Sequence, residues 1–159
     1  MDTRAYRDTY FMAIADTVAT GTDCTFSDVG AVIVRDGAVL ATGHLGAPRG
    51  VGPCRDGGCP ACVAGQPLSL TCVCVHAETN AILDAARNGV RLEGATCYGT
   101  HRPCLECLKA LTQAGIKRAV YRTARPRDPE YLRAYEAFAS AAGVMVEALP
   151  PSESVVGSP

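Results

Sequence analysis

The sequence predicts an α/β fold in which one sheet lies between two layers of helices, and two observations support this prediction. Strand and helix patterns alternate from residue 76 to residue 149. Helices that connect successive strands in this way give parallel strands with both faces covered. Upstream, Asp36-Gly37 separates two short apolar runs, which is a strong signal for an antiparallel hairpin. We therefore expect a three-layer α/β/α sandwich that opens with a hairpin and continues as a largely parallel sheet.

The composition of the chain indicates its class. The 159 residues suffice for one domain with a hydrophobic core and a possible insertion, and 48% hydrophobic and 19% charged residues are ordinary for a globular protein. The net charge of −1 gives no general attraction to nucleic acid or to an anionic membrane. No apolar run approaches the roughly 20 residues of a membrane span, and the first residues lack the basic and apolar parts of a signal peptide. We expect a cytoplasmic protein without a membrane or nucleic-acid partner.

The first half of the chain contains one predicted helix and two predicted strands. The helix covers residues 3–20, with Asp2 or Thr3 as its N-cap. Apolar residues at three- and four-residue spacing give this helix its expected buried face: Tyr6, Tyr10, Phe11, Ile14 and Val18. The strands of the hairpin cover residues 29–34 and 39–43.

The second half alternates helix and strand three times. The expected ranges, in order, are 76–89, 95–100, 104–115, 116–121, 128–142 and 144–149. Apolar residues mark the buried faces of the first two helices: Ala81, Ile82, Ala85, Ala86, Leu105, Leu108 and Leu111. The third helix has Asp128-Pro129 at its start and Gly143 at its end. The tail, residues 150–159, is polar and is expected to be loose.

Nine cysteines are unusual in a chain of this kind. An odd number argues against a complete set of disulfides, and clustered cysteines in a reducing compartment more often bind metal. Five of them fall in the irregular stretch 46–74: Cys54, Cys59, Cys62, Cys72 and Cys74. A loop this long inside a compact domain is usually functional or held by something other than packing. We expect it to be a metal-binding loop.

Two short motifs predict a catalytic metal site. His76-Ala77-Glu78 is followed by Pro103-Cys104 and, three residues later, by Cys107. One histidine and two cysteines give zinc three protein ligands and leave a fourth position for water, and Glu78 is close enough to move that water's proton. A lone Cys-x-x-Cys also occurs in zinc knuckles and redox dithiols. The two motifs in this order are much more specific, because zinc base deaminases carry this signature.

From these motifs the chain resembles the cytidine and deoxycytidylate deaminases, and most closely their deoxycytidylate (dCMP) branch. The resemblance rests on segments spread over nearly the whole chain: residues 29–37, 41–43, 46–50, 76–82, 85–89, 92–96, 103–107 and 114–116. It implies the cytidine-deaminase-like sandwich with a mixed five-stranded sheet over residues 1–149. It also implies a zinc-dependent hydrolytic deaminase of a 4-aminopyrimidine nucleotide, dCMP to dUMP first of all, and a homo-oligomer.

The resemblance further implies a second, structural zinc. Members of the dCMP branch often carry one, and Cys24 and Cys54 match two of its ligand positions. The other ligands are expected among Cys59, Cys62, Cys72 and Cys74, and spacing alone does not choose between them. A set of buried free thiols and an iron–sulfur cluster are the alternatives. Cys97 lies in a predicted strand and is expected to be an ordinary core residue.

Several residues near the expected pocket depart from the family pattern. Leu45 stands where relatives have an asparagine that hydrogen-bonds the sugar or a bound nucleotide, and Asp28 stands where many have Lys or Arg near the phosphate. The residues expected to contact substrate are Ser27, Leu45, Arg49, Ala77, His101 and Arg125.

The loop arginines leave two alternatives open. Arg49, Arg122, Arg125 and Arg127 either rebuild a phosphate site or are solvated charges. The substrate is accordingly either dCMP or another amino-heterocycle or nucleoside of specialised biosynthesis. A zinc-stabilised interaction protein on this scaffold is a third possibility, which the presence of Glu78 disfavours.

Overall fold

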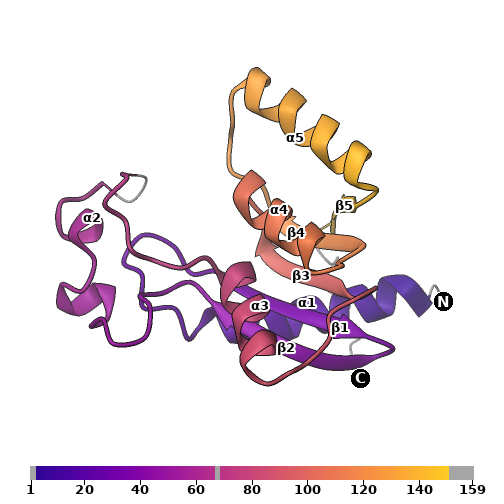
Figure 1. Ribbon diagram of the computed structural model, residues 1–159, viewed down its shortest axis with the longest axis horizontal. Coiled ribbons are helices and arrows are strands. Elements are labelled where there is room, and N and C mark those ends of the chain that lie inside the picture. Colours follow the sequence, from indigo (N-terminus) through magenta and orange to yellow (C-terminus); the bar gives the residue numbers. More distant parts are fainter. Residues whose placement is uncertain (1–2, 67–68, 151–159) are drawn as a thin grey trace, which may run out of the picture.

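The computed structural model describes residues 3–66 and 69–150, and its centre is one five-stranded sheet in the order β2-β1-β3-β4-β5 (Figure 1). The strands are β1 (Gly30–Arg35), β2 (Ala38–His44), β3 (Thr96–His101), β4 (Arg118–Thr123) and β5 (Met145–Ala148). Strand β1 pairs antiparallel with β2 and with β3, whereas β3, β4 and β5 are parallel. The predicted mixed sheet opening with a hairpin is confirmed. The predicted tail lies outside the described residues beyond residue 150.

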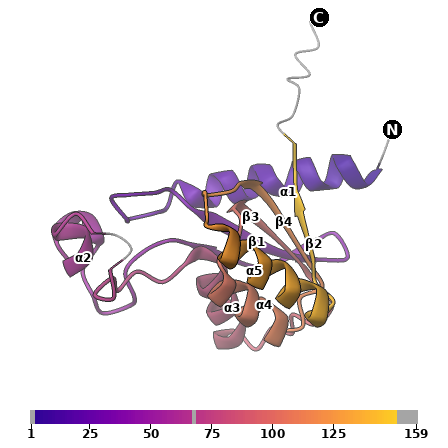
Figure 2. The ribbon, with the colours of Figure 1, turned by 90° about the horizontal axis from the view of Figure 1, so that it is seen from above.

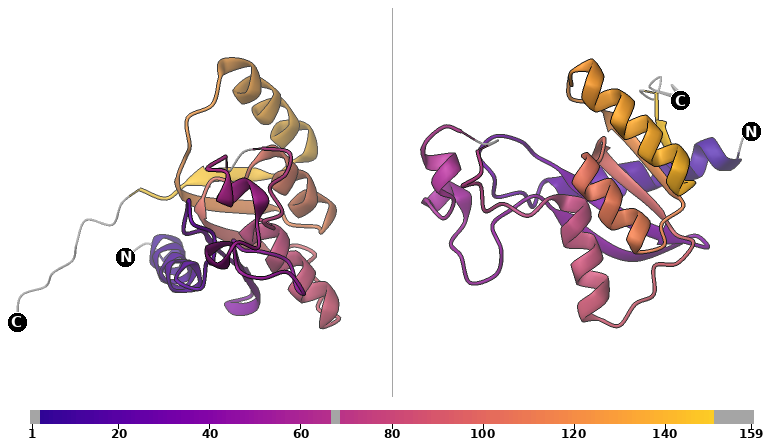
Figure 3. Two further views of the ribbon diagram at one scale, coloured as in Figure 1. Left: turned by 90° about the vertical axis from the view of Figure 1, so that its left-hand side faces the viewer. Right: turned by 45° about the horizontal axis from the view of Figure 1, so that its top comes forward.

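Helices cover both faces of the sheet, as the fold class predicted (Figures 2 and 3). The four main helices are α1 (Thr3–Ala19), α3 (Ala77–Arg87), α4 (Leu105–Gln113) and α5 (Pro129–Ala142). Helix α1 packs alone on one face, and the other three lie on the opposite face (Figure 2). Within the described residues, no helix is long and apolar enough to cross a bilayer.

The buried face of α1 agrees with the predicted one in part, because Phe11 is buried and Ile14 and Val18 are partly buried against the same cluster. Phe11, Met12 and Ala15 pack against β1 and β3. Tyr6 and Tyr10 are 62% and 54% exposed, so their assignment to the core was wrong. The prediction weighted aromatic residues and passed over Met12 and Ala15. A tyrosine at the edge of a helix face can keep its hydroxyl in water, whereas Phe11 has no polar group to hydrate.

The opposite face carries the larger core. Ala81 and Ala85 of α3 pack with Ile33 of β1 and Leu111 of α4, as expected for the two helices. Ala86, predicted on the same face as Ala85, is exposed. One residue turns a helix by about 100°, so neighbouring residues do not share a narrow face.

Residues 46–74 form a lobe beside the sandwich rather than part of it (Figure 1). The lobe contains two short helical segments that the sequence did not predict, η1 (Cys54–Asp56) and α2 (Pro60–Val63). Its buried cluster consists of cysteine and alanine: Cys54, Cys59, Ala61 and Cys62, with Cys24, Ala47, Cys72 and Cys74 partly buried against them. A two-way backbone pairing between Gly46 and Val75 closes the base of the lobe.

Candidate active site

The three residues of the predicted zinc set meet at the start of two neighbouring helices. His76 Nδ1 lies 3.5 Å from Cys104 Sγ and 3.3 Å from Cys107 Sγ, and the three ligand atoms lie within 4.8 Å of one another. One imidazole and two thiols at this separation are a donor set that zinc prefers. The structure therefore assembles a three-ligand site from residues that lie 28 and 31 positions apart in the chain.

The local backbone explains why these side chains converge. His76 is the N-cap of α3 and Cys104 is the N-cap of α4, each with extended backbone. The Cys107 N–H donates to Cys104 Sγ at 3.4 Å, so the thiol itself caps its helix. The positive ends of both helices face the site and favour thiolate over thiol. The hydrogen bond with Cys107, together with His76, lowers the pKa of Cys104 to about 4.

Glu78 lies in the first turn of α3 and is only 4% exposed. Its carboxyl lines the same cavity as His76 and Cys104. Burial raises the pKa of Glu78 above the ordinary value of a glutamate. A carboxyl on the wall of the same cavity as the three ligand side chains is placed to accept a proton and to return it.

Most of the residues predicted to contact substrate line this cavity. They are Ser27, Leu45, Ala77, His101 and Arg125. Arg49 and Asp28 are exposed and do not line it. Arg122 is directed toward the other face of the sheet, where it forms an ion pair with Asp16 of α1 at 2.6 Å.

Three cavity residues, Phe26, Arg102 and Tyr131, were not among the predicted substrate contacts. Arg127, one of the loop arginines offered for a phosphate site, also lines the cavity. The guanidinium of Arg102 lies over the ring of Tyr135, and that of Arg127 lies over Tyr131, at 5.2 and 5.1 Å. Arg102 directly precedes the Pro-Cys motif, a position that could have identified it. Tyr131 is distant in sequence, and no local pattern marks it.

His101 lies at the end of β3 on the cavity wall. Burial, and then the positive charge of Arg125, lower its pKa below the ordinary value of histidine. The imidazole is therefore neutral at pH 7, beside a permanent positive charge.

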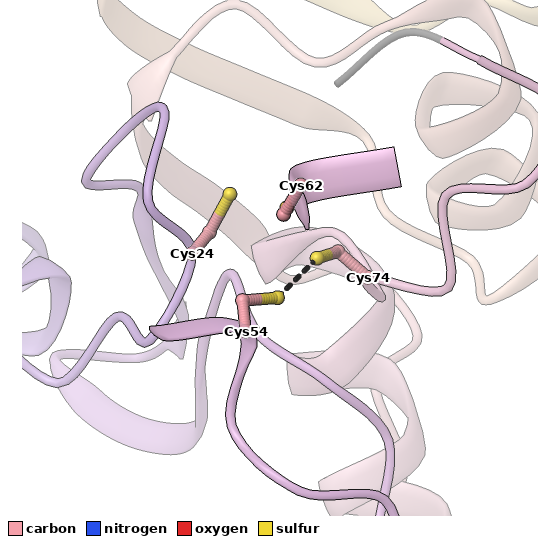
Figure 4. A group of neighbouring side chains, drawn as sticks. All are labelled: Cys24, Cys54, Cys62 and Cys74. Atoms are coloured by element: carbon pink, nitrogen blue, oxygen red, sulfur yellow. Dashed lines mark hydrogen bonds between the residues drawn. The ribbon is translucent and has the colours of Figure 1, made fainter. Parts of the chain in front are cut away.

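A second set of sulfur atoms gathers at the lobe, in two groups that share Cys74. Five of these cysteines belong to the lobe and the sixth, Cys24, comes from the loop before β1; together they are called the six lobe cysteines. The first group is Cys24, Cys54, Cys62 and Cys74 (Figure 4), and the second is Cys59, Cys72 and Cys74. Within each group all sulfurs lie within 4.8 Å of one another. Cys97, by contrast, is buried in β3 among core residues, as predicted. All six cysteines offered by the sequence for a structural metal thus lie together.

Comparison with known proteins gives the family. Deoxycytidylate deaminase of Schizosaccharomyces pombe is 40% identical over 153 residues, covering 93% of this chain and 46% of that protein. Deoxycytidylate deaminase of Mycobacterium phage D29 is 41% identical over 122 residues, covering 72% of this chain and 92% of that protein. The chain thus spans less than half the length of the yeast relative.

A solved relative has the same architecture. The dCMP deaminase from the cyanophage S-TIM5, in complex with dCMP and dUMP, superposes with a TM-score of 0.72 at 27% identity. The match covers 93% of this chain and 98% of that one. The family model of the cytidine and deoxycytidylate deaminase zinc-binding region matches residues 5–123, well over half of the chain. The chain therefore belongs to the cytidine and deoxycytidylate deaminase family, as its two motifs predicted.

Proposed function

We propose that the protein is a zinc-dependent hydrolytic deaminase that converts dCMP and water to dUMP and ammonia. The observation that carries the proposal is the burial of Glu78 on the same cavity as His76, Cys104 and Cys107. A binding protein gains nothing from a buried carboxyl beside such a site. The yeast and phage relatives named as deoxycytidylate deaminases support dCMP as the substrate.

The three-ligand site fits a catalytic zinc. His76, Cys104 and Cys107 would hold the ion, and their number leaves one position free for a fourth ligand. A zinc ion held in this way supplies a Lewis acid that lowers the pKa of bound water toward neutrality. Thr79 supports the ligand set from α3, since its Oγ1 lies 3.7 Å from Cys107 Sγ.

Glu78 is the proton carrier of the proposed reaction. Its carboxylate takes a proton from the attacking water and delivers it to the ring nitrogen next to the amine-bearing carbon. As the C–N bond breaks, the same carboxyl passes the second proton of the water to the leaving amine, which departs as ammonia. The burial of Glu78 on the wall of the same cavity places its carboxyl where it can exchange protons with the water and the substrate.

The positive side of the cavity is the proposed phosphate site. Arg125, Arg102 and Arg127 line it, and neutral His101 lies beside Arg125. Guanidinium groups bind phosphate oxygens in pairs of hydrogen bonds. Their stacking on Tyr131 and Tyr135 restricts two of the three before any ligand arrives.

Leu45 favours a second candidate substrate. Its apolar side chain is 8% exposed and lines the cavity, where it cannot hydrogen-bond a sugar hydroxyl. A site that lacks a polar partner discriminates poorly in favour of the substrate that needs one. An amino-heterocycle with a smaller or absent sugar would fit this wall equally well.

One assay tests both candidates. Ammonia release is measured with dCMP, CMP, deoxycytidine, cytosine and several aminated heterocycles, and dCMP is expected to give the highest kcat/KM. A single-stranded oligonucleotide is expected to give none. Glu78→Gln should reduce turnover by at least about 10³-fold with zinc retained. Glu136→Gln, an exposed change on α5, is the matched control. Unchanged turnover in Glu78→Gln would refute the mechanism.

We further propose that the lobe holds structural zinc, because the six lobe cysteines lie in two contiguous groups. The reduced thiols that this requires support a cytoplasmic location. The family resemblance supports a homo-oligomer, which light scattering on the zinc-loaded protein tests.

A further inference from the structure

The six lobe sulfurs are arranged as two pairs joined by two shared members. Cys24 and Cys54 form one pair, and both lie within 4.8 Å of Cys62 and Cys74. Cys59 and Cys72 form the other pair, with their sulfurs 3.9 Å apart. No sulfur of the first pair belongs to the group that contains the second.

Cys74 belongs to both groups. Its sulfur lies 2.8 Å from that of Cys54 and within 4.8 Å of those of Cys59 and Cys72. Cys62 also has contacts on both sides, because its thiol interacts with those of Cys54 and Cys59. Cys74 therefore lies beside both pairs. Cys62 lies beside the first pair and contacts Cys59, but it is outside the group of Cys59, Cys72 and Cys74, so its sulfur must move closer to that group to share a second ion.

We propose that this lobe binds two zinc ions in one six-thiolate cluster, in which Cys62 and Cys74 bridge the two ions. Cys24 and Cys54 complete the first ion's four ligands, and Cys59 and Cys72 complete those of the second. The inference rests on the proposal that the lobe binds structural zinc, and it does not depend on the deaminase activity.

Two sulfur separations can be compared with those of a zinc–thiolate site. Four thiolates about 2.3 Å from one zinc lie about 3.8 Å from one another. The 3.9 Å between Cys59 and Cys72 already has this value. Cys54 and Cys74, at 2.8 Å, need to separate by about 1 Å, a shift that side-chain rotation supplies.

A single ion would leave two thiols unexplained. It would take Cys24, Cys54, Cys62 and Cys74, the group with four members. Cys59, whose side chain is fully buried, and Cys72 would then remain as a close free pair beside a metal site. Two ions use all six thiolates and leave a net charge of −2, the same as one ion held by four.

Packing gives an independent reason for metal in the lobe. Among the residues of the lobe that the structure describes, the buried cluster holds only alanine and cysteine, so it buries little apolar surface besides the thiols. Val63 and Leu70, which could have packed a core, are 70% and 107% exposed. Ordering a segment of this length costs about 1–2 kcal/mol per residue in backbone entropy, and so small a core does not offset this cost. Metal–thiolate bonds can offset the cost, because the free energy of metal binding contributes to folding.

The cluster also adjoins the active site. Cys74 lies two residues before His76, and the cavity wall includes Cys24, Cys72 and Cys74. The Gly46–Val75 pairing joins the start of the lobe to the segment that leads into α3. Metal binding in the lobe thus fixes one wall of the proposed substrate pocket.

The first test is the zinc content of the intact protein, purified with reductant and measured by native mass spectrometry and elemental analysis. Three zinc ions per chain are expected, one at the His76 site and two in the lobe. A content of two or of one overturns the proposal, and so does iron in the lobe. Zinc X-ray absorption should in addition show a zinc–zinc scattering path, which two separate single-ion sites would not give. Its absence overturns the shared bridges.

Variants then test the ligands. Cys59→Ser and Cys72→Ser should each lower the content to two, and Cys97→Ala, a buried thiol outside the lobe, should leave it at three. A content of three in Cys59→Ser overturns the assignment. If either variant fails to fold, the zinc content and the zinc X-ray absorption of the wild-type protein still test the two-ion cluster. Wild-type protein with three zinc ions but no ammonia release would refute the deaminase function and leave the cluster standing.

Discussion

Gly43 of β2 lies directly against Ala77 in the first turn of α3. A β-carbon at position 43 would overlap the carbonyl oxygen of Ala77 and the backbone nitrogen of Ala81. The first turn of α3, which contains Glu78 and follows His76, therefore packs directly on the backbone of β2. Asn80 adds to this contact, because its side chain donates to the carbonyl oxygens of His44 and Val75 at 2.7 and 3.3 Å.

Gly43→Ala should displace α3 and impair catalysis more than stability. Overpacking of this kind costs about 1–3 kcal/mol. A misplacement of about 1 Å at a catalytic group can reduce kcat about 100-fold. Thermal unfolding and ammonia release on the same preparation measure the two effects.

Gly30 on β1 provides the matched comparison, since a β-carbon there would overlap Ala15 and Ala19 of α1, on the other face. Gly30→Ala should lower the free energy of unfolding with a smaller loss of kcat. Gly52→Ala, which meets nothing within 4 Å, should change neither. Equal losses of kcat in the two strand variants would contradict the role given to Gly43.

The phosphate preference is expected to depend on Arg125. Arg125→Ala should raise KM for dCMP about tenfold or more and leave KM for deoxycytidine nearly unchanged, because a charged hydrogen bond contributes about 1.5–3 kcal/mol. Arg122→Ala is the control, since this arginine is paired with Asp16 away from the cavity. If Arg125→Ala affects both substrates alike, the phosphate lies elsewhere.

His101 should make product binding depend on pH. Burial and Arg125 hold its pKa below the ordinary value, and a bound phosphate dianion would raise it. The complex then takes up a proton, so dUMP should bind more tightly as pH falls from 7 toward the pKa of free His101. Calorimetry with dUMP and deoxyuridine measures this, and the nucleoside should show little of the effect. Arg125→Ala should raise the pKa of His101, which NMR of the imidazole reports.

The sequence predicted the elements that local patterns encode. Asp36-Gly37 gave the hairpin, and Asp128-Pro129 gave the start of α5, where the Asp128 carboxylate caps Tyr131 N. The His76 and Cys104 motifs lie at helix starts as expected, since their spacing reflects the backbone that presents them. These features involve residues close together in the chain.

Features that depend on contacts between residues far apart in the sequence could not be predicted. Spacing could not tell which of the six lobe cysteines lie together, because their grouping depends on how the loop folds back on Cys24. The same limit applies to Arg122 and Arg125, which look alike in sequence but project toward opposite faces. Tyr6 and Tyr10 were misplaced because periodicity reports a face and not the size of the space available to it.

Asp8 and Arg118 form a largely buried pair between α1 and β4, with Arg118 Nη2 2.6 Å from Asp8 Oδ2. Burial alone would raise the pKa of Asp8, but hydrogen bonds from Arg118 and Tyr98 bring it below its ordinary value. The pair therefore stabilises the fold above about pH 3.9, the unfolded pKa, and this contribution is lost as pH falls through the folded pKa.

Arg118→Met should cost about 3 kcal/mol at pH 7, because it leaves the carboxylate of Asp8 buried without its partner. Without Arg118, burial raises the pKa of Asp8, so the carboxyl takes up a proton more readily as pH falls. The difference in free energy of unfolding between the variant and the wild type should therefore become smaller between pH 7 and pH 5. Denaturant unfolding at both values measures the deficit. Adding Asp8→Asn to Arg118→Met should recover much of the lost stability.

Arg122→Met is the control, since its pair with Asp16 is about 40% exposed and should contribute less than about 1 kcal/mol. A deficit that stays constant with pH would mean that lost packing, and not the unpaired charge, destabilises the variant.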